Sequence, residues 1–471
     1  MSSFSGRSSD IDGLSAYFRQ PKKIVRNYLA WAAHRVIVQH KPYIIGVTGT
    51  VGKTTTTHFV YEFLSQVYHE HVYMSPHNYN GEWGLSMSIL QSESPWANPF
   101  LWIILMVRAT WMAFFMRSYP KYLVLEYGID RIGEMDFMLS IAEPDVAVLL
   151  NISKNHIVNF GSFEAYAHEK AKIISRSRAI VYSHDDEIVT NLVQEALALK
   201  KIPSISYGTP KEGTDIVVGD IKSSLEGISF DITYRSETIH FNIPLVGKYQ
   251  AFNTCPVVAI ARRLSMPLSD IPELLKNVHP NRGRWVIFDG ISGSKIIDGS
   301  YNGWYVSIVA WLEDMARLPE KYYRVLLLWD MRELGDETEE MHMKVADRIK
   351  EAHPHAIYLV GPLMRELVYP RLMGAFSGHP EIIVESFLNS INAGKKIAQL
   401  LRMRNNEDSS AVVYVKWSQN TIFLEEAIKE FLFDPSDEQY LPRQNARWKK
   451  KKQDFFDIVC SELTFGESDL S

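Results

Sequence analysis

Short apolar runs alternate with amphipathic stretches along most of the chain. Each run is flanked by polar residues or glycine and is short, so it predicts a buried strand. Between the runs, apolar residues recur at helical spacing, as expected of helices that pack one face on a core. This alternation predicts α/β domains with mainly parallel sheets. The predicted strands lie at residues 43–47, 122–125, 146–150, 325–328, 357–360 and 412–415.

The pattern changes between Ile205 and Leu245, where apolar and polar residues alternate one by one. Segments 228–234 and 238–243 both show this alternation, and turn-forming residues lie between them. Such alternation is typical of strands with one buried and one exposed face. A small antiparallel sheet is therefore expected here, attached to the first α/β domain.

Residues 1–40 begin with a loose polar stretch and continue into one predicted helix, from about Pro21 to Gln39. Its lysines and arginines lie among apolar residues at helical spacing. A basic amphipathic helix can rest on a membrane surface. It can also pack on its own domain, which is the more common arrangement.

The most apolar segment runs from Trp96 to Tyr119, and a single Arg108 interrupts it. Its uninterrupted apolar length falls short of the roughly 20 residues that a membrane-spanning helix needs. A buried helix and a helix half sunk in the membrane interface, in peripheral contact with the bilayer, both fit this pattern. The basic run Lys449–Lys452 would be a second membrane contact or, more simply, part of a solvated basic tail.

Composition sets the outer bounds. The 471 residues are enough for two or three domains of roughly 150 residues each. A formal net charge of −5 gives no reason to expect nucleic acid as a partner. Only Cys255 and Cys460 are present, so neither a disulfide framework nor a cysteine-rich metal site is expected. Together with a polar start that lacks the apolar core of a signal peptide, this predicts a cytoplasmic protein, with membrane association left open by the segment 96–119.

The strand at 43–47 runs into a turn that carries two glycines and then into a helix. Glycine lets the turn point its backbone N–H groups inward at phosphate oxygens, and the helix N-terminus favours the same anion. The lysine adds positive charge and the next threonine a hydroxyl that can ligate Mg²⁺. The usual nucleotide loop has a glycine where this chain has Val47. The residues expected to bind ATP here are Gly49, Thr50, Gly52, Lys53, Thr54 and Thr55.

Two further predicted strands end at polar residues. Glu126 directly follows the strand at 122–125, and Asn151 follows the strand at 146–150, with His156 a few residues further on. Ligands of open parallel sheets bind beyond the carboxyl ends of the strands, so these side chains should meet the glycine loop at one edge. Glu126 is a hard oxygen donor for Mg²⁺, and a neutral His156 imidazole would complete a second metal site.

Several motifs, in the same order along the chain, resemble the Mur ligase family of ATP-dependent ligases. The loop at 48–55 is similar to the family's own nucleotide loop, which also lacks the first glycine. The likeness covers about residues 43–432. The other matching segments are Asn78–Asn80, Gly84, Glu126–Asp130, Gly133–Glu134, Pro144–Asp145, Asn151, His156, Phe160–Ser162, Gly247–Asn253, Ile297–Asn302, Asp330–Gly335, His342 and Val415–Ser418.

The resemblance implies roles for residues that the pattern of apolar positions does not identify. Lys170 matches a lysine that many members carry as N6-carboxylysine, formed with CO₂, whose carboxylate supports the second of two Mg²⁺ ions. Lys172 is the competing candidate, and the spacing from His156 favours Lys170.

The same resemblance extends the nucleotide site beyond the loop. Asn253 matches an asparagine that contacts adenine, Arg284 a hinge arginine, and Asp298 a residue that reaches the ribose. The implied catalytic residues are Lys53, Glu126, His156 and Lys170, and the implied metal ligands are Thr54, Glu126, His156 and Lys170.

The implied fold is α/β, with a P-loop ATPase central domain that has a parallel sheet and a small antiparallel subdomain, followed by a second Rossmann-like α/β domain. The expected division is a short helical segment at 1–40, the central domain at 41–284 with the apolar insert 96–119, the ligase domain at 285–435 and a tail at 436–471. Only about 42 residues precede the first strand, too few for the UDP-binding domain of the usual relative.

The implied activity is ATP-dependent amide bond formation through an acyl phosphate, in peptidoglycan precursor synthesis. The expected partners are ATP, Mg²⁺, a muramyl-peptide-like carboxylate and an amino acid or dipeptide amine such as D-alanyl-D-alanine, bound by a monomer. Two alternatives stay open: the same chemistry on a lipid-linked or polyglutamate-like carboxylate, and a non-catalytic ATP-binding partner protein. Trp329, Trp417 and the segment Gly303–Tyr305 depart from the family pattern in the domain that selects the amine.

Overall fold

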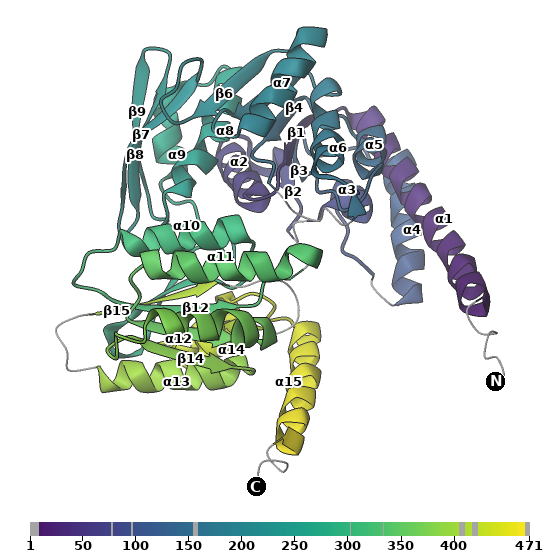
Figure 1. The fold of residues 1–471 in the computed structure, drawn as a ribbon. Helices are drawn as coiled ribbons and strands as arrows, with labels where there is room; N and C mark the ends of the chain where they lie inside the picture. Colours follow the sequence, from purple (N-terminus) through teal and green to yellow (C-terminus); the bar gives the residue numbers. More distant parts are fainter. Residues whose placement is uncertain are drawn as a thin grey trace. The chain divides into compact units, whose positions relative to one another are not determined.

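The computed structural model describes residues 9–76, 79–95, 98–153, 159–301, 303–332, 334–404, 410–416 and 423–466. The chain forms two compact units and two sheets (Figure 1). Unit 1 comprises Met1–Gly219, Ile232–Ile239 and Asn253–Leu275, and unit 2 comprises Asp220–Asp231, His240–Phe252 and Lys276–Ser471. The predicted class, a parallel-sheet α/β domain followed by a second one, is confirmed.

The first sheet has nine strands in the order β2-β3-β1-β4-β5-β6-β7-β8-β9, and the pairs from β2 to β7 are parallel. Since β1 lies between β3 and β4, the segments that follow these three strands leave the sheet at one edge. Only two residues join β8 to β9, so this pair is antiparallel, as the alternating pattern predicts. The strands are β1 (Tyr43–Thr48), β2 (Val72–Met74), β3 (Tyr122–Glu126), β4 (Val146–Leu149), β5 (Ala179–Ser183), β6 (Ser204–Gly208), β7 (Ile216–Ser223), β8 (Ile228–Tyr234) and β9 (Glu237–Ile243).

Helices cover the first sheet and bury the positions that recur at helical spacing. In α2, the residues Phe59, Val60, Phe63 and Leu64 are fully buried, as their spacing predicts. The helices of this part of the chain are α1 (Ser9–His40), α2 (Lys53–Tyr68), α3 (Gly81–Ile89), α4 (Pro99–Phe115), α5 (Glu134–Ile141), α6 (Phe163–Ser175), α7 (Glu187–Leu199), α8 (Tyr249–Arg263) and α9 (Ile271–Leu275).

The N-terminal basic segment and the apolar segment form α1 and α4, which contact each other. Helix α1 packs on its own unit through fully buried residues that include Leu29, Ala33 and Val36. Helix α4 buries one narrow face, with Leu105 and Ala109 among its members, and exposes the other. In the described part of the chain, no helix has the length and apolar character needed to cross a bilayer. The first residues of the apolar segment, Trp96 and Ala97, lie outside the described residues.

Unit 2 contains a six-stranded sheet in the order β10-β11-β15-β12-β13-β14, in which only β10 is antiparallel. Each face of this sheet packs against a separate hydrophobic core, the arrangement of a doubly wound domain. The strands are β10 (Val286–Asp289), β11 (Lys295–Gly299), β12 (Tyr323–Trp329), β13 (Ala356–Val360), β14 (Ile383–Phe387) and β15 (Ala411–Lys416). The helices are α10 (Tyr305–Ala316), α11 (Thr338–Glu351), α12 (Tyr369–Ala375), α13 (Ser390–Met403), α14 (Leu424–Lys429) and α15 (Ala446–Gly466).

The C-terminal segment is more ordered than the predicted solvated tail. It forms α15, and Phe456 joins the core of unit 2 with Trp448 and Phe455 packed against it. Lys449, Lys450 and Lys451 are exposed as expected, whereas Lys452 is buried. Charge runs predict exposure, but one turn of a helix places every fourth residue on the packed side.

Candidate functional site

The glycine loop that follows β1 has a backbone shape that requires glycine. Gly49 has a φ of +151° and Gly52 a φ of +90°, a region that side chains rarely allow. A Cβ atom on Gly49 would lie 2.9 Å from the Cβ of Leu150, so space is also limiting there. Helix α2 starts directly after Gly52, so the loop ends at a helix N-terminus that favours an anion.

Asn151, two residues after the end of β4, holds this loop in shape. Its carbonyl oxygen accepts a hydrogen bond from the Thr50 N–H (2.8 Å), and its Oδ1 accepts one from the Val51 N–H (2.8 Å). Its Nδ2 donates in turn to the Val51 carbonyl (2.9 Å). The loop is therefore fixed by the neighbouring strand, so a ligand would not have to order it.

Lys53 folds back over the loop. Its Nζ donates to the carbonyl oxygens of Gly49 (2.8 Å) and Thr50 (3.2 Å), so the ammonium lies above the turn. Thr54 is buried on the first turn of α2, and Thr55 is half-buried beside it. The predicted loop residues thus form one cationic turn.

Glu126 lies at the same edge of the sheet. It ends β3 directly opposite Val47, the residue before the last of β1, and is buried. Thr48 Oγ1 donates to the Tyr127 carbonyl (2.7 Å), which fixes the two strand ends together. The side chain of Asn80 lies close to the segment that follows β3, because a Cβ atom on Gly128 would lie 2.9 Å from it. His156, the other predicted metal ligand, lies outside the described residues, as does Asn78.

Lys170 of α6 is buried in the same unit, and its ammonium lies 4.9 Å from the ring centre of Tyr166. Burial lowers the pKa of Lys170 well below its ordinary value, the charge of Lys53 lowers it further, and Asp130 acts in the opposite direction. The two lysines are therefore close enough to repel each other. The competing candidate, Lys172, forms ion pairs at the protein surface with Asp136 (2.5 Å) and Glu169 (2.7 Å).

Asn253 of α8 also lies beside the loop. Its Oδ1 accepts a hydrogen bond from Thr56 Oγ1 (3.3 Å), and a Cβ atom on Gly52 would lie 3.5 Å from the same oxygen. Unit 1 therefore brings together Gly49, Gly52, Lys53, Thr54, Glu126, Lys170 and Asn253.

Arg284 and Asp298 belong to unit 2, where they form a second charged cluster with Lys416. Asp298 is fully buried at the end of β11, and its Oδ1 accepts a hydrogen bond from the Ser300 N–H (2.8 Å). Burial raises the pKa of Asp298 to about 6. Burial, followed by the charge of Arg284, lowers the pKa of Lys416 to about 7, and Asp298 opposes this shift. Asp298 Oδ2 has no hydrogen-bond partner among the described residues, so it is available to a ligand hydroxyl.

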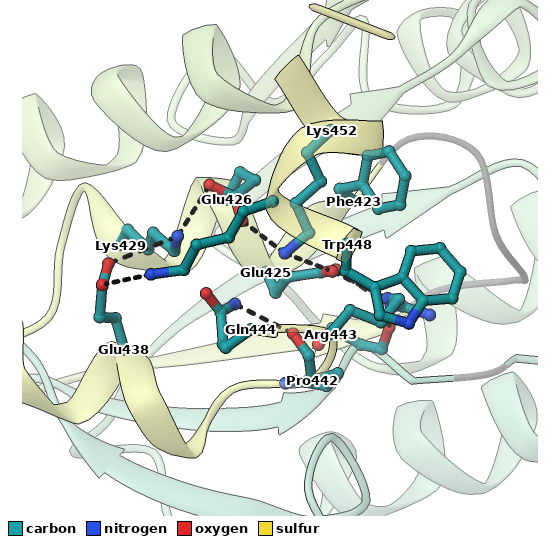
Figure 2. Close-up of polar contacts among 12 residues, drawn as sticks. Phe423, Glu425, Glu426, Lys429, Glu438, Pro442, Arg443, Gln444, Trp448 and Lys452 are labelled. Carbon is teal, nitrogen blue, oxygen red and sulfur yellow. Dashed lines mark hydrogen bonds and ion pairs between the residues drawn. The ribbon is translucent and has the colours of Figure 1, made fainter. Parts of the chain in front are cut away.

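A buried ionic network supports this second cluster (Figure 2). Arg443 donates to both carboxylate oxygens of Glu425 (2.8 and 3.0 Å) and to the Ser300 carbonyl (2.7 Å). Lys452 of α15 pairs with Glu425 (3.0 Å) from the other side. Burial alone would raise the pKa of Glu425, but Arg443 and Lys452 outweigh it and hold that pKa below its ordinary value. The C-terminal helix thereby fixes the segment that follows Asp298.

The donor set in unit 1 fits Mg²⁺ bound together with a nucleotide. Among the described residues, no three acidic, histidine or cysteine side chains form a cage for a metal ion. Mg²⁺ sites at phosphates do not need one, because one or two protein oxygens, substrate phosphates and waters complete the octahedron. The Thr54 hydroxyl and the Glu126 carboxylate, both buried, supply such oxygens.

Three residues in or beside these clusters were not among the site residues predicted from the sequence. The Tyr166 hydroxyl is hydrogen-bonded to Thr50 Oγ1 (3.1 Å), and the Tyr166 ring packs on Lys170. The sequence feature that could have identified Tyr166 is its position one helical turn before that lysine. Lys416 directly follows the predicted strand at 412–415, just as Glu126 directly follows the strand at 122–125, so the same sequence feature could have identified it. Arg443 has no local signal, because its partners are distant in the sequence.

The chain matches known proteins over most of its length. Residues 47–100 and 107–261 match the family model described as the Mur ligase middle domain. The UDP-N-acetylmuramoyl-tripeptide--D-alanyl-D-alanine ligase of Bacillus subtilis (strain 168) is 27% identical over 323 residues, which is 68% of this chain and 63% of that protein. The enzyme of the same name from Escherichia coli (strain K12) is 23% identical over 75% of this chain and 72% of its own. The chain thus spans less than two thirds of the length of the Bacillus subtilis relative.

Solved structures share the fold. MurF from Acinetobacter baumannii has a TM-score of 0.69 and 21% identity, and covers 86% of this chain and 80% of its own. The MurF ligase of Thermotoga maritima in complex with ADP has a TM-score of 0.67 and 22% identity, with coverages of 89% and 85%. The folylpolyglutamate synthase of Mycobacterium tuberculosis has a TM-score of 0.59 and 14% identity, and covers 83% of this chain and 92% of its own.

Proposed function

We propose that the chain is an ATP-dependent acid–amino-acid ligase of the Mur ligase family that acts in peptidoglycan precursor synthesis, because residues 47–100 and 107–261 match the middle domain of that family and the relatives reported above carry the corresponding name. The observation that carries the proposal is the site in unit 1. A glycine loop pre-shaped by Asn151 bears Lys53, and buried Glu126 and Lys170 lie on the adjacent strand and helix of the same unit. Such a site can hold a triphosphate and stabilise the charge of a transferring phosphoryl group.

The reaction has two steps. A carboxylate oxygen of the first substrate attacks the γ-phosphorus of ATP, ADP leaves, and an acyl phosphate forms. The amine of the second substrate then attacks the acyl carbon, phosphate leaves, and the amine nitrogen loses a proton. No protein nucleophile is required, so the work of the chain is to bind, orient and neutralise charge. In this scheme Lys53 leaves the loop carbonyls and follows the phosphates.

We assign the metal ligands to Thr54, Glu126 and His156. Bound Mg²⁺ would neutralise the phosphate oxygens and make the γ-phosphorus more electrophilic. Two ions are proposed, and Lys170 supports the second as N6-carboxylysine. The amine nitrogen of Lys170 would form a bond to the carbon of CO₂ and release a proton, and burial favours the neutral amine that this step needs.

We assign the rest of the nucleotide to three further residues. Asn253, next to the loop, would contact adenine, and Asp298 would accept a hydrogen bond from a ribose hydroxyl through its Oδ2. Arg284 would correspond to the arginine at the hinge before the last domain. These assignments rest on the likeness of the surrounding motifs and on the burial of Asp298.

The proposed acceptor is a muramyl peptide and the proposed amine is D-alanyl-D-alanine or an amino acid. The names of the relatives support this choice. The second candidate is the same chemistry on a lipid-linked or polyglutamate-like carboxylate. It is supported by the folylpolyglutamate synthase, whose fold this chain covers more completely than that of the other structures compared above. We further propose that the enzyme works as a monomer in the cytoplasm, where ATP is available.

Phosphate release by the purified chain tests these proposals. The protein is incubated with ATP, Mg²⁺ and UDP-N-acetylmuramoyl tripeptide, with and without D-alanyl-D-alanine. The mass of the product is then measured by mass spectrometry. Dipeptide-dependent release with a product of the expected mass supports the first candidate. Release only with a polyglutamate or lipid-linked carboxylate supports the second. Binding of ATP without turnover on any acceptor contradicts both and leaves a non-catalytic nucleotide-binding protein.

A further inference from the structure

Helix α4 exposes its bulkier apolar face to solvent. Phe100, Ile104, Val107 and Phe115 each expose between 61% and 75% of their surface, and they recur at helical spacing. The buried face of the same helix holds smaller side chains on average, including Ala109 and Ala113. A helix that is apolar all round and not enclosed by its own domain is a feature of interaction surfaces.

Helix α1 extends this face. The Tyr28 hydroxyl contacts Thr110, and the ring centre of Trp31 lies 5.9 Å from that of Phe114, so the two helices lie side by side in parallel (Figure 1). We call the joint surface the α1/α4 face. Its exposed members are Ile24, Trp31 and Val38 of α1 and Phe100, Ile103, Ile104, Val107, Trp111, Phe114 and Phe115 of α4.

The two sequence segments that form this face carry only basic charges. Segments 21–41 and 99–121 contain no aspartate or glutamate, although the whole chain has a formal net charge of −5. They contain eight lysines and arginines, of which Arg35 lies over the ring of Phe114 (5.5 Å) and Arg26 pairs with Glu82 of α3 (2.6 Å). Apolar side chains rich in Trp and Phe, bordered by cations, are the composition of helices that lie in the interface of an anionic membrane.

A basic pocket adjoins the C-terminal ends of both helices. Its volume is about 520 Å³, and its lining includes Lys41 after α1 and Arg117 and Lys121 after α4. Two histidines and three tyrosines also line it, and no acidic residue does. It lies where β1 and β3 begin, at the sheet edge opposite the glycine loop, so it is separate from the nucleotide site. Its chemistry suits a phosphate group.

We propose that the α1/α4 face is a docking surface for an anionic lipid membrane and that the basic pocket receives a lipid phosphate. A second copy of the chain is a poorer occupant, because a two-fold contact would set this predominantly cationic surface against itself. The apolar side chains enter the interface while the helices stay parallel to it, since neither is long and apolar enough to span. The surface is independent of the ligase chemistry.

Vesicle sedimentation of the full-length chain without ATP tests the proposal. Vesicles of phosphatidylcholine alone are compared with an equal mixture of phosphatidylcholine and phosphatidylglycerol, at low and high salt. The wild type should bind the mixed vesicles and lose binding as salt rises. The double variant Ile104→Glu/Val107→Glu should bind at least about tenfold more weakly. Leu199→Glu, an exposed leucine on α7, is the matched control and should bind like the wild type.

The pocket is tested with Arg117→Gln/Lys121→Gln, against the exposed pair Lys200→Gln/Lys201→Gln as control. Removing two cations should weaken binding to mixed vesicles about fivefold per charge and leave binding to phosphatidylcholine unchanged. Equal binding by wild type and Ile104→Glu/Val107→Glu would overturn the proposal. So would a wild type that ignores vesicles but self-associates through this face, as shown by light scattering of wild type and the double variant.

Discussion

Two buried charged groups, one in each unit, are arranged in opposite ways. In unit 1, Lys170 is buried near Lys53, and their repulsion helps to lower the pKa of Lys170. In unit 2, Glu425 is enclosed by two cations, Arg443 and Lys452. Like charges held together indicate a place for a ligand of opposite charge, whereas a closed ion network indicates a structural role. Substitutions in the first group should therefore change activity, and substitutions in the second should change stability.

The largest effect is expected for Lys53→Ala. The ammonium is the cation of the glycine loop, so its removal should lower the rate of phosphate release about a thousandfold or more. The free energy of unfolding should change by less than about 1 kcal/mol, because Asn151 also holds the loop in shape through its own hydrogen bonds to Val51. Undiminished release would contradict the assignment of the site. Lys200→Ala, on the surface of the same unit, is the control.

In unit 2, Glu425→Gln should destabilise without altering the chemistry directly. It leaves two buried cations, Arg443 and Lys452, without their shared anion, so the free energy of unfolding should fall by about 3 kcal/mol. Urea denaturation followed by tryptophan fluorescence measures this loss. Glu438→Gln removes an exposed partner of lysines and should cost less than about 1 kcal/mol. Equal effects of the two variants would remove the contrast between the units.

Lys170→Met separates the two lysine candidates. It replaces a buried amine by an apolar side chain of similar length, so stability should be kept or should rise. Phosphate release should fall about a hundredfold if the side chain acts at the site. Lys172→Met should retain nearly full activity, because Lys172 is engaged with Asp136 and Glu169. A larger loss of activity in Lys172→Met would reverse the assignment.

The smallest effect is a pH dependence in unit 2. Lys416 has a pKa of about 7 in the folded chain against an ordinary value of 10.5, so between these values the unfolded chain holds more protons. The contribution of Lys416 to the free energy of unfolding therefore rises with pH across that window. Below pH 7 the full free-energy cost of burying the charged ammonium is present. Lys416→Met should gain stability over wild type at neutral pH and lose that advantage toward pH 10, measured by urea midpoints. A pH-independent difference would show that the ammonium is not the cause.

The same contrast decides what the sequence could predict. The glycine loop and Glu126 lie in short local patterns, a strand that runs into a turn and a strand that ends at an acidic residue, so their place at one sheet edge was predictable. Lys170 was indicated only by the family resemblance, because the pattern of apolar positions does not identify it. The network of Glu425, Arg443 and Lys452 depends on tertiary packing of segments with no common pattern, and it was missed. Periodicity likewise failed for Lys452, which looks like any other member of a basic run until one face of α15 is buried.

The apolar segment shows a second limit. Its composition predicted a helix, and α4 is one, but composition did not decide between a buried helix and an exposed one. The neighbour that contacts α4 is α1, from a distant part of the sequence, and Leu105, Ala109 and Met112 are buried in the same core as residues of α1. The face of a helix that remains exposed to solvent thus depends on the neighbouring helix as well as on the helix itself.

The folded-back position of Lys53 should influence which anions the glycine loop prefers. An incoming anion competes with the carbonyl oxygens of Gly49 and Thr50 for the same ammonium. A single phosphate competes weakly for the lysine, because it carries little charge. Neighbouring phosphates of one polyphosphate can bind the lysine ammonium and the backbone N–H groups of the loop at the same time. We therefore expect the loop to prefer dense, linear polyanions over the inorganic phosphate that the proposed reaction releases.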